Sequence, residues 1–367
     1  MSDTDVFRHI EYNECMKALR SVMEVPMGSR VMLRMDLDVP MKDDEVLDDS
    51  RLKKSLVTID ILLQKKCKIV IVGHRGRPQG TEIQKEFTLY PIFVRLQNLL
   101  TEMRHESVDV VFIDTITDEE RIIKAIDVHT LICVENIRFS EKEEKNDPTF
   151  LRQVVESMDC YVNDALSVSH RPHWSIMIFE RIPAYYGVAF IHEVQQIFSI
   201  IKKDEHPITV ILGGAKKDKL HYLPALAVIA DHVLIGGKLP LLMQDADKLR
   251  SDSVIVGDLR PDGKDVSGET IQHFISIISQ SKTVIWAGAM GLFEEENARK
   301  GTQEIARALT NVRGNTIIAG GDTEASVRKL HLEENVSLIA SGGGVMLELL
   351  TKKTLPAWRH GSDTGNK

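Results

Sequence analysis

A short apolar run that ends in glycines or polar residues, followed by a helix-like stretch, repeats along the whole chain. In the first half the runs are Arg30–Met35, Cys67–Val72, Val108–Ile113, Thr130–Val134 and Cys160–Val162. In the second half they are Ile208–Leu212, His232–Ile235, Thr283–Trp286, Thr316–Ile318 and Ser337–Ile339. Runs that are apolar throughout suit strands covered on both faces, and their alternation with helices indicates parallel sheets. Because ten strands are too many for one small sheet, the pattern predicts two doubly wound α/β domains.

Helical periodicity fills many of the intervals between these runs. It predicts helices over Leu52–Gln64, Thr270–Ser279, Thr302–Leu309 and 187–203. A chain of 367 residues is long enough to bury two cores. We therefore expect an N-terminal domain over 1–186, an interdomain helix over 187–203, a C-terminal domain over 204–358 and a polar tail over 359–367.

The composition argues against several classes of protein. The formal net charge of −8 disfavours nucleic acid or an anionic membrane as a partner. The first twenty residues contain no apolar run that could serve as a signal peptide or membrane span. The four cysteines show no CxxC pairing, and three lie in or beside apolar runs, which indicates reduced, buried thiols. We expect a cytoplasmic protein, and a monomer because a design of two domains with a closing cleft favours one.

Charged side chains follow the runs of the first half. Ligands bind beyond the carboxyl ends of parallel strands, so these positions are candidates for a site. They are Asp36, Asp38 and, at the start of the next helix, Arg51, then His74 and Arg77, then Arg138 and Arg171. Any one of these arginines could be a solvated surface residue. Several at one sheet edge, in a chain of negative net charge, predict an anion pocket, because the planar guanidinium grips carboxylate and phosphate through paired hydrogen bonds.

Glycine loops follow the runs of the second half. The loops contain Gly213 and Gly214 with Lys216 and Lys219, Gly237 with Lys238, Gly288, Gly320 with Gly321, and Gly343. Glycine lets backbone amides approach a ligand closely, and a helix N-terminus favours phosphate. A single such loop can be a simple turn, but five at one sheet edge favour a nucleotide site, at which Asp322 could hold magnesium. The Walker A pattern is absent, and no GxGxxG follows a strand.

Many short motifs occur in one order from about residue 30 to about residue 356. They are Arg34–Pro40, Asp48–Arg51, Gly73–Pro78, Glu135–Phe139, Glu143–Asp147, Tyr161–Ala165, Ser169–Arg171, Ile211–Lys216, Gly291–Glu294, Gly320–Thr323, and Ser341–Gly344 with Leu347–Leu350. In this order and spacing they resemble the signatures of the phosphoglycerate kinase family. The resemblance implies two lobes that close about a hinge, with 3-phosphoglycerate bound in the N-terminal lobe and magnesium-ATP or ADP in the C-terminal lobe. The implied reaction is reversible phosphoryl transfer between ATP and the substrate carboxylate.

The resemblance also assigns roles by position. Asp36, Asp38 and Arg51 would face the carboxylate end of the substrate, and His74, Arg77, Arg138 and Arg171 would hold its phosphate. Gly213, Gly214, Gly237, Gly288, Gly321 and Thr323 would line the nucleotide site, with Lys216 and Lys219 at its phosphates, Glu294 at the ribose and Asp322 at the metal. The catalytic group would comprise Arg51, Lys216, Lys219, Gly320 and Gly343.

Departures from the family pattern leave two alternatives open. The loop Gly214–Lys219 is one residue short, Trp286–Ala289 lacks an amide and a proline, Ala319 replaces a glycine, Lys238 replaces a small residue, and Asp38 stands where asparagine is usual. The chain could therefore act on a different phosphorylated or phosphonate carboxylate, such as one whose amine pairs with Asp38. It could also be a non-catalytic homologue that retains only the anion site. The base preference is likewise open.

Overall fold

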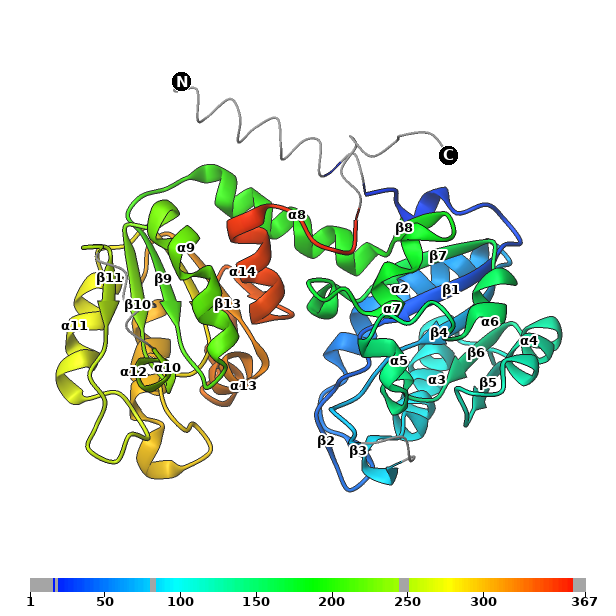
Figure 1. The fold of residues 1–367 in the computed structure, drawn as a ribbon, viewed down its shortest axis with the longest axis horizontal. Coiled ribbons are helices and arrows are strands. Elements are labelled where there is room, and N and C mark those ends of the chain that lie inside the picture. The colour runs from blue at the N-terminus through cyan, green and yellow to red at the C-terminus, as the bar shows by residue number, and fades with distance from the viewer. Residues whose placement is uncertain (1–15, 17–18, 80–83, 244–250, 359–367) are drawn as a thin grey trace. The chain divides into compact units, whose positions relative to one another are not determined.

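Two compact units make up the fold. The computed structural model describes residues 16, 19–79, 84–243 and 251–358. The division between the units falls inside helix α8 (Val188–Lys203), between Val194 and Gln195, and residues 356–358 belong with the N-terminal unit. Each unit contains one six-stranded sheet flanked by helices (Figure 1), and the predicted fold class is confirmed. The expected tail, 359–367, lies outside the described residues.

The sheet of the N-terminal unit has the order β5-β6-β4-β1-β7-β8, and its neighbouring strands are parallel. Its strands are β1 (Arg30–Met35), β4 (Lys68–Val72), β5 (Val110–Ile113), β6 (Leu131–Val134), β7 (Cys160–Asp164) and β8 (Ala184–Tyr186). Its helices are α2 (Ser50–Gln64), α3 (Tyr90–Arg104), α4 (Glu119–Val128), α5 (Glu141–Glu144), α6 (Arg152–Glu156) and α7 (Trp174–Met177). A hairpin of β2 (Met41–Lys42) and β3 (Glu45–Val46) follows β1.

Alternation along the strands explains why this sheet is covered on both faces. Leu33 and Ile71 belong to a core cluster that includes residues of α2 and α3. Met32 and Val70 belong to a second cluster, with residues of α4, α6 and α7. Because successive strand residues point to opposite faces, one apolar run contributes side chains to both core clusters.

The sheet of the C-terminal unit has the order β11-β10-β9-β12-β13-β14, again with parallel neighbours. Its strands are β9 (Ile208–Leu212), β10 (His232–Ile235), β11 (Val254–Val256), β12 (Thr283–Ala287), β13 (Asn315–Ala319) and β14 (Leu338–Ala340). Its helices are α9 (Leu223–Ile229), α10 (Leu239–Leu242), α11 (Gly268–Ile278), α12 (Lys300–Leu309), α13 (Gly321–Lys329) and α14 (Gly343–Lys352). One core cluster joins the sheet to α11, α12 and α13.

The strand order marks where ligands should bind in this second sheet. From β9 the chain builds outward through β10 and β11, then returns to the other side of β9 to build β12, β13 and β14. A doubly wound sheet opens a crevice beyond the carboxyl ends of its strands where the order reverses. That point lies between β9 and β12, directly before Gly213 and Gly288.

The remaining sequence expectations have mixed outcomes. The ten predicted strands are present with small shifts at their ends, but β8, β11 and the hairpin were not predicted. The thiols of Cys67, Cys133 and Cys160 are free and buried, and Cys15 lies outside the described residues. Within the described ranges, every helix is too short or too polar to cross a membrane.

Candidate active site

The carboxyl ends of β1, β4, β6 and β7 deliver charged side chains to one edge of the N-terminal sheet. Arg34 lies on β1, His74 follows β4, Arg138 follows β6, and His173 comes after the turn that follows β7. Electrostatic interactions connect His74 with Arg34, Arg138, Arg171 and His173, which places these groups in one cluster. These five residues, called the basic cluster below, are the candidate anion site of this unit.

Arg34 organises the basic cluster, and the assignment by position missed it. Its side chain is fully buried, with 1% exposed. The guanidinium donates from Nε to Ser175 Oγ (3.0 Å), from a terminal nitrogen to the Met35 carbonyl, and from the other to His74 Nδ1 (2.8 Å). A guanidinium can only donate hydrogen bonds, so Nδ1 of His74 accepts. The proton of neutral His74 therefore sits on Nε2.

A buried carboxylate balances part of this charge. Glu143 of α5 is 1% exposed and accepts from the backbone N–H of Ser175 (2.9 Å) and from its Oγ (2.6 Å). Burial raises the pKa of Glu143, while Arg34 and these hydrogen bonds oppose the shift. Ser175 thus links the carboxylate to the Arg34 guanidinium through a single hydroxyl.

Mutual repulsion and burial keep the histidines of the cluster neutral. Desolvation, together with Arg34 and Arg138, holds the pKa of His74 well below its usual 6.5. Burial and the neighbouring arginines lower the pKa of His173 to about 3. Even the pKa of Arg138 falls to about 10, mainly through desolvation and then through Arg34 and Arg171. A site that crowds cations this closely gains by accepting an anion.

Arg51 is held at the edge of the cluster by acidic partners. It lies one residue into α2, and Nη1 donates to both carboxylate oxygens of Asp36 (3.3 and 3.2 Å) and to the Asp38 carbonyl (3.1 Å). Asp36 is 6% exposed, whereas the Arg51 side chain is 20% exposed. The ion pair therefore holds the arginine in place while part of its side chain remains exposed.

The Asp38 carboxylate and Arg138 both form hydrogen bonds with the backbone of Gly76. Oδ1 of Asp38 accepts from the Gly76 N–H (2.9 Å), and Nη1 of Arg138 donates to the Gly76 carbonyl (2.8 Å). Oδ2 of Asp38 lies 4.0 Å from Nε2 of His74. Asp38 therefore brings a negative charge to the open side of the basic cluster.

The other two predicted phosphate contacts have different surroundings. Arg171 contributes to the field at His74 and Arg138, and its Nε lies 3.4 Å from Nε2 of His170. Arg77 is exposed on the loop after β4. The structure thus brings His74, Arg138 and Arg171 together and leaves Arg77 at the surface.

The glycines of the C-terminal unit form a tightly packed edge at the β9–β12 crevice. Gly214, Gly237, Gly288 and Gly320 all have positive φ, a region that favours glycine. A Cβ on Gly288 would lie 2.3 Å from the Gly213 carbonyl oxygen. The N–H groups of Gly213 and Gly214 donate across the crevice to the carbonyls of Ala287 (3.0 Å) and Ala289 (2.7 Å). At Gly213, Gly237 and Gly288, backbone therefore meets backbone with no room for a side chain.

The two lysines of the shortened loop have different environments. Nζ of Lys219 donates to the carbonyls of Gly213 (2.8 Å) and Ala287 (2.9 Å), at the ends of β9 and β12. Lys216 is exposed at the start of the same loop. One ammonium is thus fixed over the crevice while the other projects into solvent.

Two helix N-termini lie on the β13–β14 side of this edge. Gly320 precedes α13, Gly343 begins α14, and a Cβ on Gly320 would lie 3.8 Å from the Gly343 N–H nitrogen. Thr323 is fully buried, and its Oγ1 accepts from the Gly288 N–H (2.9 Å). Gly321 and Asp322 occupy the first turn of α13, but the Asp322 side chain lies outside the described part of the structure. Converging helix N-termini favour phosphate groups.

A pocket of about 120 Å³ opens on the opposite side of the crevice. It is lined by Gly214, Ala215, Gly237, Lys238, Lys264, Ala289, Gly291, Leu292, Phe293 and Glu294. Glu294 is exposed at this pocket, as a residue that contacts a ribose must be. Lys264, on the segment between β11 and α11, was not predicted from the sequence.

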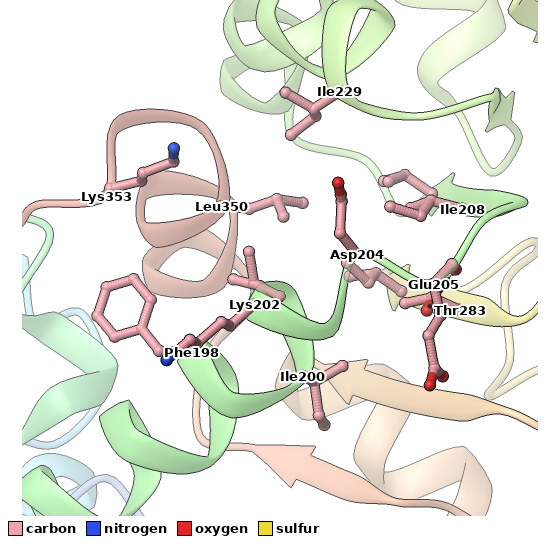
Figure 2. Close-up of a pocket in the computed structure, with 13 residues that line it drawn as sticks. Phe198, Ile200, Lys202, Asp204, Glu205, Ile208, Ile229, Thr283, Leu350 and Lys353 are labelled. Carbon is pink, nitrogen blue, oxygen red and sulfur yellow. Dashed lines mark hydrogen bonds between the residues drawn. The ribbon is translucent and has the colours of Figure 1, made fainter. Parts of the chain in front are cut away.

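A second, more apolar pocket of about 140 Å³ lies near the amino ends of β9 and β12 (Figure 2). Phe198 and Ile200 of α8, Leu350 of α14 and Thr283 of β12 line it. Among its described lining residues is none of the predicted site residues. Because ligands of parallel sheets bind at the carboxyl ends, the glycine edge is the stronger candidate for a ligand site in this unit.

Comparisons with known proteins agree with this geometry. The family model for phosphoglycerate kinase matches residues 23–258 and 251–353. A phosphoglycerate kinase from Rubrobacter xylanophilus is 33% identical over 387 residues, covering 92% of this chain and 96% of its own length. One from Finegoldia magna is 32% identical and covers 90% of this chain and 95% of its own length.

Solved structures give the same result. The phosphoglycerate kinase of Coxiella burnetii superposes with a TM-score of 0.69 at 25% identity, over 92% of this chain and 97% of the other. The enzyme from Pyrococcus horikoshii superposes with a TM-score of 0.74 at 22% identity, again over 92% and 97%, and supports the fold. This chain therefore belongs to the phosphoglycerate kinase family.

Proposed function

We propose that this protein transfers a phosphoryl group reversibly between a nucleoside triphosphate and the carboxylate of 3-phosphoglycerate. The observation that carries the proposal is the basic cluster around Arg34, which concentrates buried cations in a chain of net charge −8. Membership of the family makes the protein a phosphotransferase that acts on a carboxyl group.

The substrate has two anionic ends, and the N-terminal unit offers two groups of hydrogen-bond donors for them. His74, Arg138 and Arg171 form a crowded cluster suited to a phosphate, which accepts several hydrogen bonds. Arg51, held by Asp36, is suited to the carboxylate end, where charge changes during transfer. Arg77 would complete the phosphate contact from the exposed loop.

The reaction requires little covalent chemistry from the protein. A carboxylate is already a nucleophile, so no general base is required. Transfer then depends on in-line positioning and on neutralising the charge of the transferred group. We assign that neutralisation to Arg51, Lys216 and Lys219, with the amides at Gly320 and Gly343.

The family implies magnesium, and the donor chemistry of the site is suitable. Magnesium binds through one or two carboxylates and completes its shell with phosphate oxygens and water. Asp322, in the first turn of α13, would be the protein's carboxylate. Bound there, the ion would neutralise phosphate charge.

The direct test is a coupled spectrophotometric assay with 3-phosphoglycerate and either ATP or GTP. We expect turnover that requires a divalent cation and is lost in Arg138→Met. Arg152→Met, which removes an exposed arginine of α6, is the matched control and should keep full activity. A protein that binds nucleotide but turns over no 3-phosphoglycerate would contradict the proposal.

One observation favours a second candidate, a substrate other than 3-phosphoglycerate. Asp38 brings a carboxylate within 4.0 Å of Nε2 of His74. A phosphorylated or phosphonate carboxylate with an amine could pair with that charge. A panel of such compounds in the same assay tests this candidate, and it fails if none exceeds 3-phosphoglycerate in kcat/KM.

We also propose the finer assignments that accompany this function. Residues 1–186 would bind the phosphorylated carboxylate, 187–203 would join the domains, and 204–358 would bind the nucleotide. The protein would act as a cytoplasmic monomer without nucleic acid or membrane partners. Light scattering coupled to size-exclusion chromatography tests the oligomeric state, and a mass of twice the chain would contradict it.

A further inference from the structure

The pocket beside Gly214 carries polar side chains that a base-binding pocket does not require. Of its ten lining residues, seven are glycine, alanine, leucine or phenylalanine. The other three are Lys238, Lys264 and Glu294. Two lysines therefore border a largely apolar pocket.

The position of the pocket favours a base over a phosphate. Phosphate groups are best held at the N-termini of α13 and α14, on the β13–β14 side of the crevice. The pocket lies on the β10–β11 side, where Lys238 precedes only the four-residue α10. If a nucleotide has its phosphates at α13 and α14, this pocket, which Gly237 and Leu292 help to line, remains available for its base.

Lys264 is fixed in orientation by a carboxylate next to the pocket. Its Nζ donates to Oε2 of Glu295 at 2.6 Å, and both side chains are 42% exposed. An ammonium has three donors and no acceptor, so donors remain for a ligand. Lys238 is exposed, and its backbone N–H donates to the Gly214 carbonyl (2.9 Å), which anchors its position at the rim.

Purine bases differ in what they present to such donors. Guanine presents two neighbouring acceptors, O6 and N7, whereas adenine presents the N7 acceptor beside an N6 amino donor. A lysine ammonium can bond to both acceptors of guanine, but it faces a donor at the 6-position of adenine.

We propose that Lys238 and Lys264 make the nucleotide site selective for 6-oxopurine nucleotides, guanosine or inosine phosphates, over adenosine phosphates. The inference rests on the proposed function, because it names the nucleotide of that same site. A good contact of this kind discriminates against the wrong base by roughly tenfold or more.

Equilibrium binding tests this without requiring turnover. Calorimetric titrations of the full chain with GDP, IDP and ADP, each with magnesium, should give GDP and IDP about tenfold tighter than ADP. Lys264→Met and Lys238→Ser should each reduce that ratio, and the double variant should bring it near one. Lys300→Met, at an exposed position that starts α12, is the matched control and should keep the wild-type ratio.

The outcomes separate this inference from the function on which it rests. Tight binding of ADP with no preference for GDP would overturn the inference and leave the proposed function intact. Preference for GDP without preference for IDP would also overturn it, because the 2-amino group and not O6 would then be recognised. If no nucleotide bound, the proposed function would fail and this inference with it.

Discussion

The two units build their candidate anion sites, each at the carboxyl edge of a parallel sheet, from different parts of the chain. The N-terminal unit uses buried side chains that hold one another: Arg34 bonds His74 and Ser175, and Ser175 bonds Glu143. The C-terminal unit uses backbone, with glycines so close that a Cβ on Gly288 would lie 2.3 Å from a carbonyl oxygen. Substitutions that remove side chains should therefore impair the first site most, and substitutions that add side chains should impair the second.

The largest effect should come from Arg51, the partly exposed cation of the N-terminal unit. Arg51→Ala removes the group that we place against the carboxylate, and we expect kcat to fall by about 10³–10⁵-fold. Lys53→Ala, an exposed position on the same helix, should stay close to wild type. A fall of less than tenfold for Arg51→Ala in the coupled assay would remove Arg51 from the catalytic group.

Arg34→Met tests the buried network through stability. The change removes the positive charge near the buried Glu143 carboxylate and the hydrogen bond to His74. We therefore expect the free energy of unfolding to fall by about 3–5 kcal/mol. Urea unfolding measures it. Arg30→Met, on the same strand but 37% exposed and paired with Asp127, should lose at most about 1 kcal/mol. Equal losses of unfolding free energy in the two variants would contradict a large contribution of the buried network to stability.

Gly288→Ala tests the second site by adding a side chain. The φ of +108° and the nearby Gly213 carbonyl make alanine unfavourable by about 1–3 kcal/mol, and the shifted loop should weaken nucleotide binding. Gly268→Ala is the control, since a Cβ there meets nothing within 4 Å. Unchanged nucleotide affinity in Gly288→Ala, by calorimetry, would contradict the tight backbone edge.

The neutral histidines predict how stability changes with pH. Unfolded histidines bind protons near pH 6.5, but His74 and His173 remain neutral in the folded state to far lower pH, about 3 for the pKa of His173. Stability should therefore fall as the pH drops from about 6.5 toward 3, by up to about 1.4 kcal/mol per pH unit for each histidine. His173→Asn should flatten this slope in urea unfolding between pH 4 and 7. His221→Asn, an exposed site in the other unit, should retain it.

The smallest effect concerns Asp38. Asp38→Asn keeps an oxygen for the Gly76 N–H but removes the charge near His74 and Arg138. We expect the KM for 3-phosphoglycerate to fall several-fold, on the order of 1 kcal/mol. A rise in KM, with an amine-bearing substrate lost at the same time, would favour the second candidate function.

The fold was largely predictable because each buried strand is a continuous apolar run. The strands β8 and β11, of three residues each, were not predicted, and their length alone does not explain this, because β14 is equally short and was predicted. The charged residues at the strand ends were visible from position alone, including His74 and Arg138.

The supporting residues were harder to predict. Arg34 interrupts an apolar run, and that interruption was the available signal of a buried, partnered charge. Glu143, His173 and Lys264 lie in segments without strand periodicity, so only the tertiary structure brings them to a site. Sequence patterns locate the ends of elements, whereas hydrogen bonds between distant loops decide which side chains meet there.

The central claim is that the basic cluster is built to hold a phosphate, and direct binding tests it best. Calorimetric titration of the full chain should show that 3-phosphoglycerate binds, that glycerate, which lacks the phosphate, binds at least tenfold more weakly, and that Arg138→Met abolishes the difference. Equal affinity for the two compounds in the wild-type protein would contradict the account.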